Sequence, residues 1–580
     1  MSLQGYADLI FRLSTAPQKP SLSCQPMFDP AKMALTRIDF AAAGFAFIAI
    51  VLPYLFKRRK QLKGLRGPQR ESYLSGVEYK LRLENLQQAG DLTYKWAEKY
   101  GSTYKIWGCF GQKILVTSDP RAIQYILHQH VVEFPAPRDI RRFFELIFGR
   151  GVIWAVGEEH RRHRRVLSPA FSINHMKGFV PLFQQHVTQL AEKLNAELRH
   201  GTQVLDIIPW SHKVTLDVIG ESSFNYQFGA LKDKPNELTN ALKDLEDIAN
   251  SPSPSQTIIQ ALPRHLPKLI SYFQARYLPT NVEKGFLKYL ELSNQKAREM
   301  MHTSGLVVGD EHNEKAETSG KERDVLSVLV RANRAEDPRK RLTEDEVLAQ
   351  MSTLIQAGHH TTGYSFAWIL YELSRNPMDQ QKVYEEIKHI HSRTSGELSD
   401  PDYDELASSW LGLCVKEALR LHPVVTQLVR EPTYPDLVPL ELPVESSSGE
   451  TISEVPVQAG QRILVDIGVY NRLEAVWGPD ANEWNPSRFL DNSAPMKSVS
   501  VGMTANLLTF SGGSKGCIGW RFALMELHAL LAGLLEQFHF SLPADVEIRS
   551  AQLGLTVPIV GGKENEGPML PLVVRRRRPN

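Results

Sequence analysis

The sequence predicts a mainly α-helical protein with a minor β portion, and three observations indicate this fold class. Residues 152–300 have a mostly helical pattern of apolar positions. A second helical pattern runs unbroken over 343–375, which at about 1.5 Å per residue gives roughly 48 Å, enough to cross a whole domain. Short strand-like runs, such as QRILVDIGVY (461–470) and PLVVRRRR (571–578), fill the remainder.

Local signals mark the first elements of the main part of the chain. Residues 100–118 alternate between polar and apolar side chains like the two strands of a hairpin. Asp119 followed by Pro120 then indicates a helix that begins with an N-cap and a proline in its first turn. Residues 302–322 are charged and aperiodic, so we expect an exposed loop there.

The long helix has the clearest start and stop signals in the chain. Thr343 and Glu346 have the spacing of a capping box, in which each side chain accepts from the other residue's backbone N–H. The Asn-Pro pair at 376–377 ends the helix, because the residue before a proline avoids helical backbone angles. Further helices are expected around Glu417 and over 520–538.

Composition excludes several classes of protein. Hydrophobic residues make up 42% of the 580 positions and charged residues 23%, as in an ordinary globular protein. The net charge of +2 gives no reason to expect a nucleic-acid partner. The few cysteines are too far apart for a disulfide framework or a CxxC zinc site; they are Cys24, Cys109, Cys414 and Cys517. If Cys517 binds a metal, it is the lone protein ligand.

One stretch near the N-terminus differs from the rest of the chain. Residues 40–56, FAAAGFAFIAIVLPYLF, carry no charge and are followed at once by the basic block KRRKQLKGLR. A helix of this length rises roughly 26 Å, just short of the ~30 Å hydrocarbon core of a bilayer. The basic block predicts that the chain after it lies on the cytosolic side. A cleaved signal peptide fits poorly, and a buried core helix is the other alternative.

The expected organisation therefore has four parts. Residues 1–37 are expected to be disordered, 38–56 to form a transmembrane anchor, and 57–76 to form a basic linker that contains glycine and proline. Residues 77–580 are expected to fold as the single functional domain. Met33 offers an alternative translation start.

The segment FSGGSKGCIG, residues 510–519, places one cysteine in a loop that is nearly half glycine. A phosphate-binding loop needs Ser or Thr after its lysine, but Lys515 is followed by Gly516, which excludes that class. A cysteine-dependent hydrolase or acyltransferase stays open, because its histidine base can lie anywhere in the sequence.

A metal-bound thiolate fits the local physics best. Backbone amides can approach the Cys517 sulfur closely at four glycines: Gly512, Gly513, Gly516 and Gly519. The helix that begins near Ile518 directs its positive end at this sulfur, which favours the thiolate. A lone thiolate suits an iron whose other ligands come from a porphyrin, and Lys515 could reach an anionic propionate of that porphyrin.

The same segment resembles the haem-binding signature of the cytochrome P450 family, F-x-x-G-x-[RHK]-x-C-x-G. The resemblance implies that haem b is bound with the Cys517 thiolate as its axial ligand. It also implies haem-loop roles for Phe510, Lys515 and Gly519, with Lys515 as a permitted variant of the usual arginine.

The long helix carries a second resemblance, AGHHTT at 357–362, which is similar to the family's [AG]-G-x-[DE]-T-T. We expect the small residues Ala357 and Gly358 to let the helix open around dioxygen, and the Thr361 hydroxyl to relay a proton to it. The sequence departs from the family at His360, which occupies the usual acid position. Histidine also carries protons near neutral pH, so we expect activity with an altered proton supply.

A third resemblance is the sequence EALR, in which Glu417 and Arg420 lie at i and i+3 on one helical face and can form an ion pair. Arg488, in NPSRF, is expected to complete a buried Glu–Arg–Arg cluster behind the haem loop. Such a cluster fixes structure more than it adds net stability.

The family usually has W-x-x-x-R where this chain reads GEEHRRHRR, residues 157–165. His160 and Arg164 keep the i, i+4 spacing, so a hydrogen bond from His160 to a haem propionate is a plausible substitute. Arg430, in TQLVREP, matches another propionate contact of the family.

The resemblance covers nearly all the chain after residue 63 and implies a membrane-anchored monooxygenase of the endoplasmic reticulum with its catalytic domain in the cytosol. It implies a lipophilic substrate, O₂, and electrons from NADPH through a separate P450 reductase, since the chain has no dinucleotide fingerprint. The departures from the motifs resemble fungal members, which suggests secondary metabolism. The alternatives are an isomerase or dehydratase with this fold, an idle haem binder, and a membrane-tethered cysteine acyltransferase.

Overall fold

A computed structural model of the chain describes residues 62–234, 237–238, 240–241, 254–265, 279–303, 324–337, 339–394, 400–490 and 499–577. These residues belong to a unit that runs from Gln61 to Asn580. The segments 1–37 and 38–56 lie outside the described residues, as does most of the loop expected over 302–322. Among the helices that the structure describes, none is long and apolar enough to span a bilayer.

The described residues are mainly helical, as the sequence predicts. The helices are α3 (Glu78–Gln87), α4 (Asp91–Tyr100), α5 (Pro120–Gln124), α6 (Arg138–Phe148), α7 (Gly157–Leu167), α8 (Ile173–Lys177), α9 (Val180–Glu197), α10 (Ile207–Phe224), α12 (Pro254–Ala261), α14 (Asn281–Thr303), α15 (Val325–Ala335), α16 (Glu344–Arg375), α17 (Pro377–Thr394), α18 (Asp400–Ser408), α19 (Trp410–Leu421), α20 (Ile467–Tyr470), α21 (Glu474–Trp477) and α22 (Trp520–Gln537). Short turns of other helical types connect several of them.

The strands form small sheets rather than one large one. They are β1 (Thr103–Trp107), β2 (Lys113–Thr117), β3 (Gln203–Asp206), β4 (Gln427–Arg430), β5 (Asp436–Glu445), β6 (Thr451–Val457), β7 (Ile463–Asp466), β8 (Phe538–Ser541), β9 (Ile548–Leu553), β10 (Leu555–Val560) and β11 (Pro571–Arg576). Their orders are β1-β2-β7-β4, β3-β11-β8, β9-β10 and β5-β6.

The local signals at the hairpin and the two caps are confirmed. β1 and β2 pair antiparallel, with Thr103 opposite Thr117. The Asp119 carboxylate accepts from the backbone of the first turn of α5, with Pro120 in that turn. The full capping box is present at the start of α16, between Thr343 and Glu346.

One strand prediction is wrong in its second half. The run 461–470 was expected to be extended throughout, but β7 ends at Asp466 and residues 467–470 form α20. The Asp466 side chain accepts from the Val469 N–H and caps this short helix. Because all of residues 461–470 are buried, apolar periodicity carries no information about where the strand stops.

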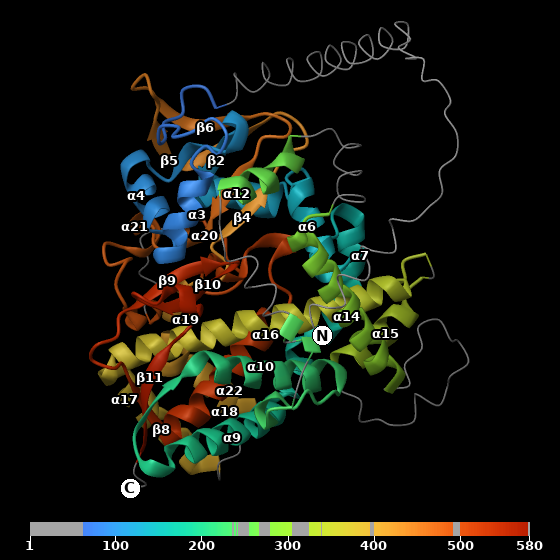
Figure 1. The fold of residues 1–580 in the computed structure, drawn as a ribbon, viewed down its shortest axis with the longest axis vertical. Coiled ribbons are helices and arrows are strands. Elements are labelled where there is room, and N and C mark those ends of the chain that lie inside the picture. Colours follow the sequence, from blue (N-terminus) through green and yellow to red (C-terminus); the bar gives the residue numbers. More distant parts are fainter. Residues whose placement is uncertain are drawn as a thin grey trace, which may run out of the picture. The chain divides into compact units, whose positions relative to one another are not determined.

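Helix α16 lies at the centre of the described fold (Figure 1). It packs against α10, α14 and α22, and also against α19 and β10. Trp368 of α16 is fully buried, and its indole N–H donates to the Thr556 carbonyl of β10 at 3.2 Å. The helix is therefore held along its length, and its middle is a fixed platform for a site.

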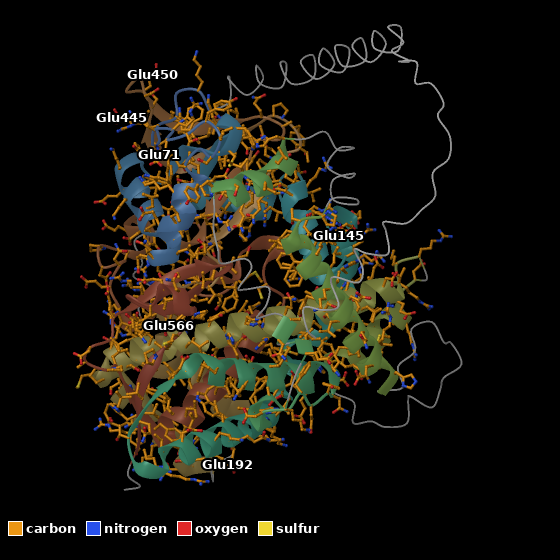
Figure 2. All side chains as sticks on the ribbon, viewed as in Figure 1. Glu71, Glu145, Glu192, Glu445, Glu450 and Glu566 are labelled. Atoms are coloured by element: carbon orange, nitrogen blue, oxygen red, sulfur yellow. The ribbon has the colours of Figure 1, made fainter. Side chains whose placement is uncertain are left out.

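The exposed end of the β5–β6 hairpin lies at an outer edge of the fold and carries Glu445 and Glu450 (Figure 2). Glu445 pairs with Arg66. Charged side chains are normally exposed in this way, so ionisable groups in the interior need a local explanation.

Candidate active site

Cys517 follows two short turns, Leu508–Phe510 (η9) and Gly513–Lys515 (η10), and precedes α22. Its backbone N–H donates to the Phe510 carbonyl at 2.9 Å, which closes the loop. The side chain is accessible, yet burial raises the pKa of its thiol, and the Gly519 N–H and Arg164 only partly oppose this rise. A sulfur that is both accessible and poorly solvated borders an enclosed space.

This electrostatic balance corrects one expectation from the sequence. The amides and the helix start were expected to favour the thiolate by themselves, but the raised pKa of Cys517 keeps the thiol protonated at neutral pH. Ionisation therefore depends on a metal that displaces the proton, which is usual for thiolate ligands.

Two of the loop glycines are required by close packing. Gly513 has φ +66°, and a Cβ there would lie 1.9 Å from the Leu127 carbonyl oxygen. A Cβ on Gly512 would lie 2.1 Å from the Val501 carbonyl oxygen. Among the described residues, the amide that hydrogen-bonds to the sulfur is that of Gly519. Gly512 and Gly513 thus let neighbouring segments seat the loop, rather than bring amides to the sulfur as the sequence predicted.

The middle of α16 has one side that is less buried than the rest. Between residues 347 and 370 every residue is buried except four, which are Ala357, Gly358, His360 and Thr361. Positions i, i+1, i+3 and i+4 share one side of a helix, so these four mark the less tightly packed side of α16. They are the residues of this helix that the sequence singled out.

The helix continues without a break through Ala357 and Gly358. The Thr361 hydroxyl donates to the Ala357 carbonyl at 2.6 Å. Gly358 permits close packing, because a Cβ there would lie 2.5 Å from Ile219 Cδ1 of α10.

A half-buried group of basic side chains lies beside Cys517. Burial, together with the positive charges of Arg430, Arg141 and Arg164, lowers the pKa of Lys515 to about 7. Burial, Lys515 and Arg164 likewise lower the pKa of His160 to about 3. Burial lowers the pKa of Arg430 to about 10.

These cations are held by backbone oxygens. Arg164 donates to the Gly516 carbonyl at 2.6 Å, Lys515 donates to the Ala155 carbonyl, and Arg430 donates to its neighbour Val429 at 2.9 Å. Within the described ranges none of the three forms an ion pair. Half-buried basic groups without ion pairs favour an anionic occupant, and the two carboxylates of haem have the right charge. The residues present therefore fit the cofactor that the resemblance implies.

The expected Glu–Arg–Arg cluster is present and buried. Glu417 pairs with Arg420 at 2.8 Å, both side chains having no exposed surface, and with Arg488 at 3.0 Å. Arg420 also donates to the Asn471 carbonyl at 2.8 Å. The Asn471 side chain in turn accepts from the Leu508 N–H at 3.1 Å, which ties the cluster to the first turn of the cysteine loop.

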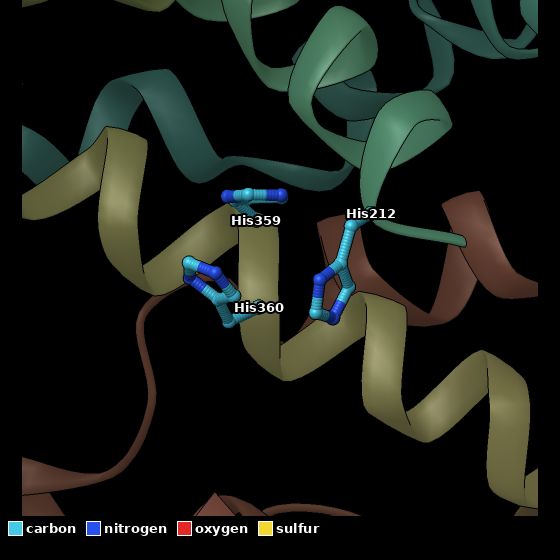
Figure 3. Close-up of side chains that lie close together, drawn as sticks. All are labelled: His212, His359 and His360. Atoms are coloured by element: carbon cyan, nitrogen blue, oxygen red, sulfur yellow. The ribbon is translucent and has the colours of Figure 1, made fainter. Parts of the chain in front are cut away.

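Two histidines that sequence reasoning did not place in the site accompany His360 (Figure 3). His359 is its neighbour on α16, and His212 comes from α10; the His212 ring centroid lies 5.3 Å from that of His359 and 4.9 Å from that of His360. His359 could have been noted from its place in the motif. Nothing in the sequence around His212 connects it to His359, which lies 147 positions later in the chain.

The comparisons with known proteins agree with this geometry. The family model for cytochrome P450 matches residues 77–563. Cytochrome P450 monooxygenase 219 of Postia placenta is 32% identical, over 89% of this chain and 93% of its own length. Cytochrome P450 monooxygenase claU of Ampulloclitocybe clavipes is 29% identical, over 92% and 96%. This chain therefore belongs to the cytochrome P450 family, among fungal relatives.

Proposed function

We propose that this chain is a haem-thiolate monooxygenase that inserts one atom of O₂ into a lipophilic organic substrate. The observation that carries the proposal is the accessible Cys517 sulfur, enclosed beside the cations of Arg164, Arg430 and Lys515. The relatives are named monooxygenases, and this chain matches them over nearly their whole length, which supports the same reaction class.

When bound, the haem supplies the oxygen-activating chemistry, and the chain's own residues hold it and manage protons. Cys517 would be its protein ligand, and His160, Arg164, Arg430 and Lys515 would hold its carboxylates. His160 serves as a hydrogen-bond donor in its neutral form, because its pKa of about 3 excludes the charged form at neutral pH.

Thr361 and His360 are the proton-handling residues in this proposal. The Thr361 hydroxyl donates to the Ala357 carbonyl, so its oxygen can accept a further hydrogen bond on the open side of α16. Burial lowers the pKa of His360 to about 4. The ring is therefore neutral at pH 7, and it handles a proton through the N–H of one ring nitrogen.

The first test is the spectrum of the reduced, carbon monoxide-bound protein. We expect the strongly red-shifted Soret band of a haem thiolate, and its loss in Cys517→Ala. Absence of the band from the unchanged protein would reject haem–thiolate ligation and leave a cysteine acyltransferase as the better reading. Turnover of lipophilic candidates with NADPH and a P450 reductase then distinguishes an enzyme from an idle haem binder.

The proton roles have a separate test. His360→Asp restores the acid that the family usually has, and we expect a smaller share of the NADPH electrons to be lost as peroxide. An unchanged peroxide yield would remove His360 from proton delivery.

A second candidate function is an isomerisation or dehydration that needs no outside electrons. The observation that favours it is the neutral His360, which is a weaker proton donor than a carboxylic acid. Product formation without NADPH and reductase distinguishes this candidate from the monooxygenase.

We further propose that residues 38–56 anchor the enzyme in the endoplasmic reticulum membrane, with the folded part in the cytosol. The support is the uncharged run with its basic flank. Expression without residues 1–56 should move the protein from the membrane fraction to the soluble fraction, and continued membrane pelleting would contradict a single N-terminal anchor.

A further inference from the structure

The three histidines between α10 and α16 bring three imidazole nitrogens to one place. One ring nitrogen of each of His212, His359 and His360 lies within 4.8 Å of the other two. The rings of His359 and His360 have centroids 4.0 Å apart (Figure 3). Elsewhere in the described ranges, only one other group of metal-ligating side chains comes as close together.

Ring nitrogens of two of the three histidines are poorly satisfied. His359 is 1% exposed, and neither of its ring nitrogens makes a hydrogen bond of normal geometry within the described residues, although the His212 backbone lies near. His212 Nε2 is also buried without a partner there. Leaving a buried polar atom unpaired costs about 1–3 kcal/mol, so a further occupant that binds His212 and His359 would be stabilising.

The backbone leaves room for this arrangement. The His212 ring lies against Gly363 of α16, where a Cβ would be 2.7 Å from His212 Cδ2. Any larger residue at 363 would push the ring away from the other two. Gly363 therefore permits His212 to face the α16 histidines.

The chemistry of the three side chains selects the class of occupant. Imidazole binds metals through a ring nitrogen, and three such nitrogens meet here. No carboxylate belongs to the group, which disfavours Mg²⁺ and Ca²⁺, whereas imidazole suits Zn²⁺, Cu²⁺ and Ni²⁺. We propose that His212, His359 and His360 form a binding site for a divalent transition metal ion of the zinc class.

The other close group shows what a satisfied cluster looks like. His163 lies 3.2 Å from Glu346 and 3.1 Å from the Gln350 amide nitrogen, so both of its ring nitrogens have partners. Arg162 also pairs with Glu346 and compensates its charge. Both ring nitrogens of His163 are thus satisfied by protein groups, whereas His212 and His359 have buried ring nitrogens without a partner in the described residues.

A bound ion would tighten the cluster. Tetrahedral zinc with bonds of about 2.0–2.1 Å places its ligand nitrogens roughly 3.4 Å apart. The nitrogens now lie within 4.8 Å of one another, so they must approach by at most about 1.4 Å. That movement is within the reach of side-chain rotation around the present positions.

The test uses the full-length, haem-loaded protein and Zn²⁺ as the probe. After chelator treatment and dialysis against low-micromolar Zn²⁺, elemental analysis should find one zinc for each haem iron. His212→Phe and His360→Gln should each weaken zinc binding by about tenfold or more, since even indirect supports of a metal site are worth that much. His389→Ala removes an exposed histidine of α17 and should bind like the unchanged protein.

Gly363→Ala provides a variant that removes no nitrogen. Its methyl group should displace the His212 ring and weaken zinc binding, while the carbon monoxide-bound spectrum reports whether the haem is retained. Absence of zinc from the unchanged protein would overturn the proposal and leave water as the occupant. Equal zinc content in His212→Phe would overturn it as well, because the ion would then lie elsewhere. Neither result bears on the reaction class.

Discussion

Glu417→Gln should destabilise the fold far more than its small change in shape suggests. Glu417 accepts two hydrogen bonds from Arg420 at 2.8 Å and two from Arg488 at 3.0 and 3.2 Å. It also accepts from the Asn485 N–H at 2.9 Å. The substitution replaces one acceptor oxygen with an NH₂ group that faces these donors. It leaves the Arg420 charge without an acid partner, whereas Arg488 keeps its pair with Asp480.

The magnitude follows from burial. Removing one partner of a buried ion pair costs about 3–5 kcal/mol. Arg420 keeps hydrogen bonds to backbone carbonyls, including that of Asn471, so we expect the lower end, about 3 kcal/mol. This corresponds to roughly a hundredfold change in the ratio of folded to unfolded protein.

Asp480→Asn is the matched control. Asp480 pairs with the same Arg488 at 2.9 Å, but its side chain is 33% exposed. Solvent screens such a pair, so this amide substitution should cost about 1 kcal/mol or less.

Urea unfolding followed by circular dichroism measures the difference, and haem content measured in parallel reports on the loop. Because Asn471 joins Arg420 to Leu508, Glu417→Gln should also reduce haem content. Equal loss of unfolding free energy in Glu417→Gln and Asp480→Asn would refute the reasoning, since burial would then make no difference.

Two further predictions concern the loop and the acid stability of the fold. Gly513→Ala should lose most of its haem, because its methyl group would meet the Leu127 carbonyl at 1.9 Å in a left-handed backbone region; a carbon monoxide band of full intensity would contradict this. Burial alone would raise the pKa of Glu346, but hydrogen bonds from Arg162 and the Thr343 backbone outweigh burial and lower it to about 2. The stability that the Glu346 carboxylate contributes is therefore present above pH 4.5, the ordinary pKa of a glutamate, and is lost as the pH falls toward 2. The unfolding free energy of Glu346→Gln should therefore decline less steeply than that of the unchanged protein over this pH range. Identical acid profiles would exclude that contribution.

Features set by neighbouring residues were predictable from the sequence. The capping box of Thr343 and Glu346 and the N-cap at Asp119 depend on contacts over two or three residues, so spacing alone identifies them. The same holds for the ion pair between Glu417 and Arg420, which lie three residues apart on α19. Arg488 required the family resemblance, because it comes from a distant turn.

Features set by tertiary packing were not predictable in this way. The end of β7 at Asp466 is hidden in a fully buried run, although an aspartate before a short helix could have been read as a cap. The role of Gly513 depends on Leu127, which lies hundreds of positions earlier in the chain. The glycines of the loop were visible in the sequence, but the sequence did not show that Gly513 packs against the segment around Leu127.

His160 and His360 both stand where the chain departs from the family motifs, but the charges around them differ, and so do their expected roles. His160 lies among cations, where Lys515 and Arg164 further lower its pKa, so two bound carboxylates would reverse its surroundings. His360 lies with His212 and His359, where burial alone lowers its pKa and no anion is expected. His160 therefore replaces the neutral N–H donor of the family's usual tryptophan by another neutral donor, and the surrounding basic side chains still favour bound carboxylates. His360 replaces an acid by a neutral ring, so proton supply is the property in which this enzyme should differ most from its family.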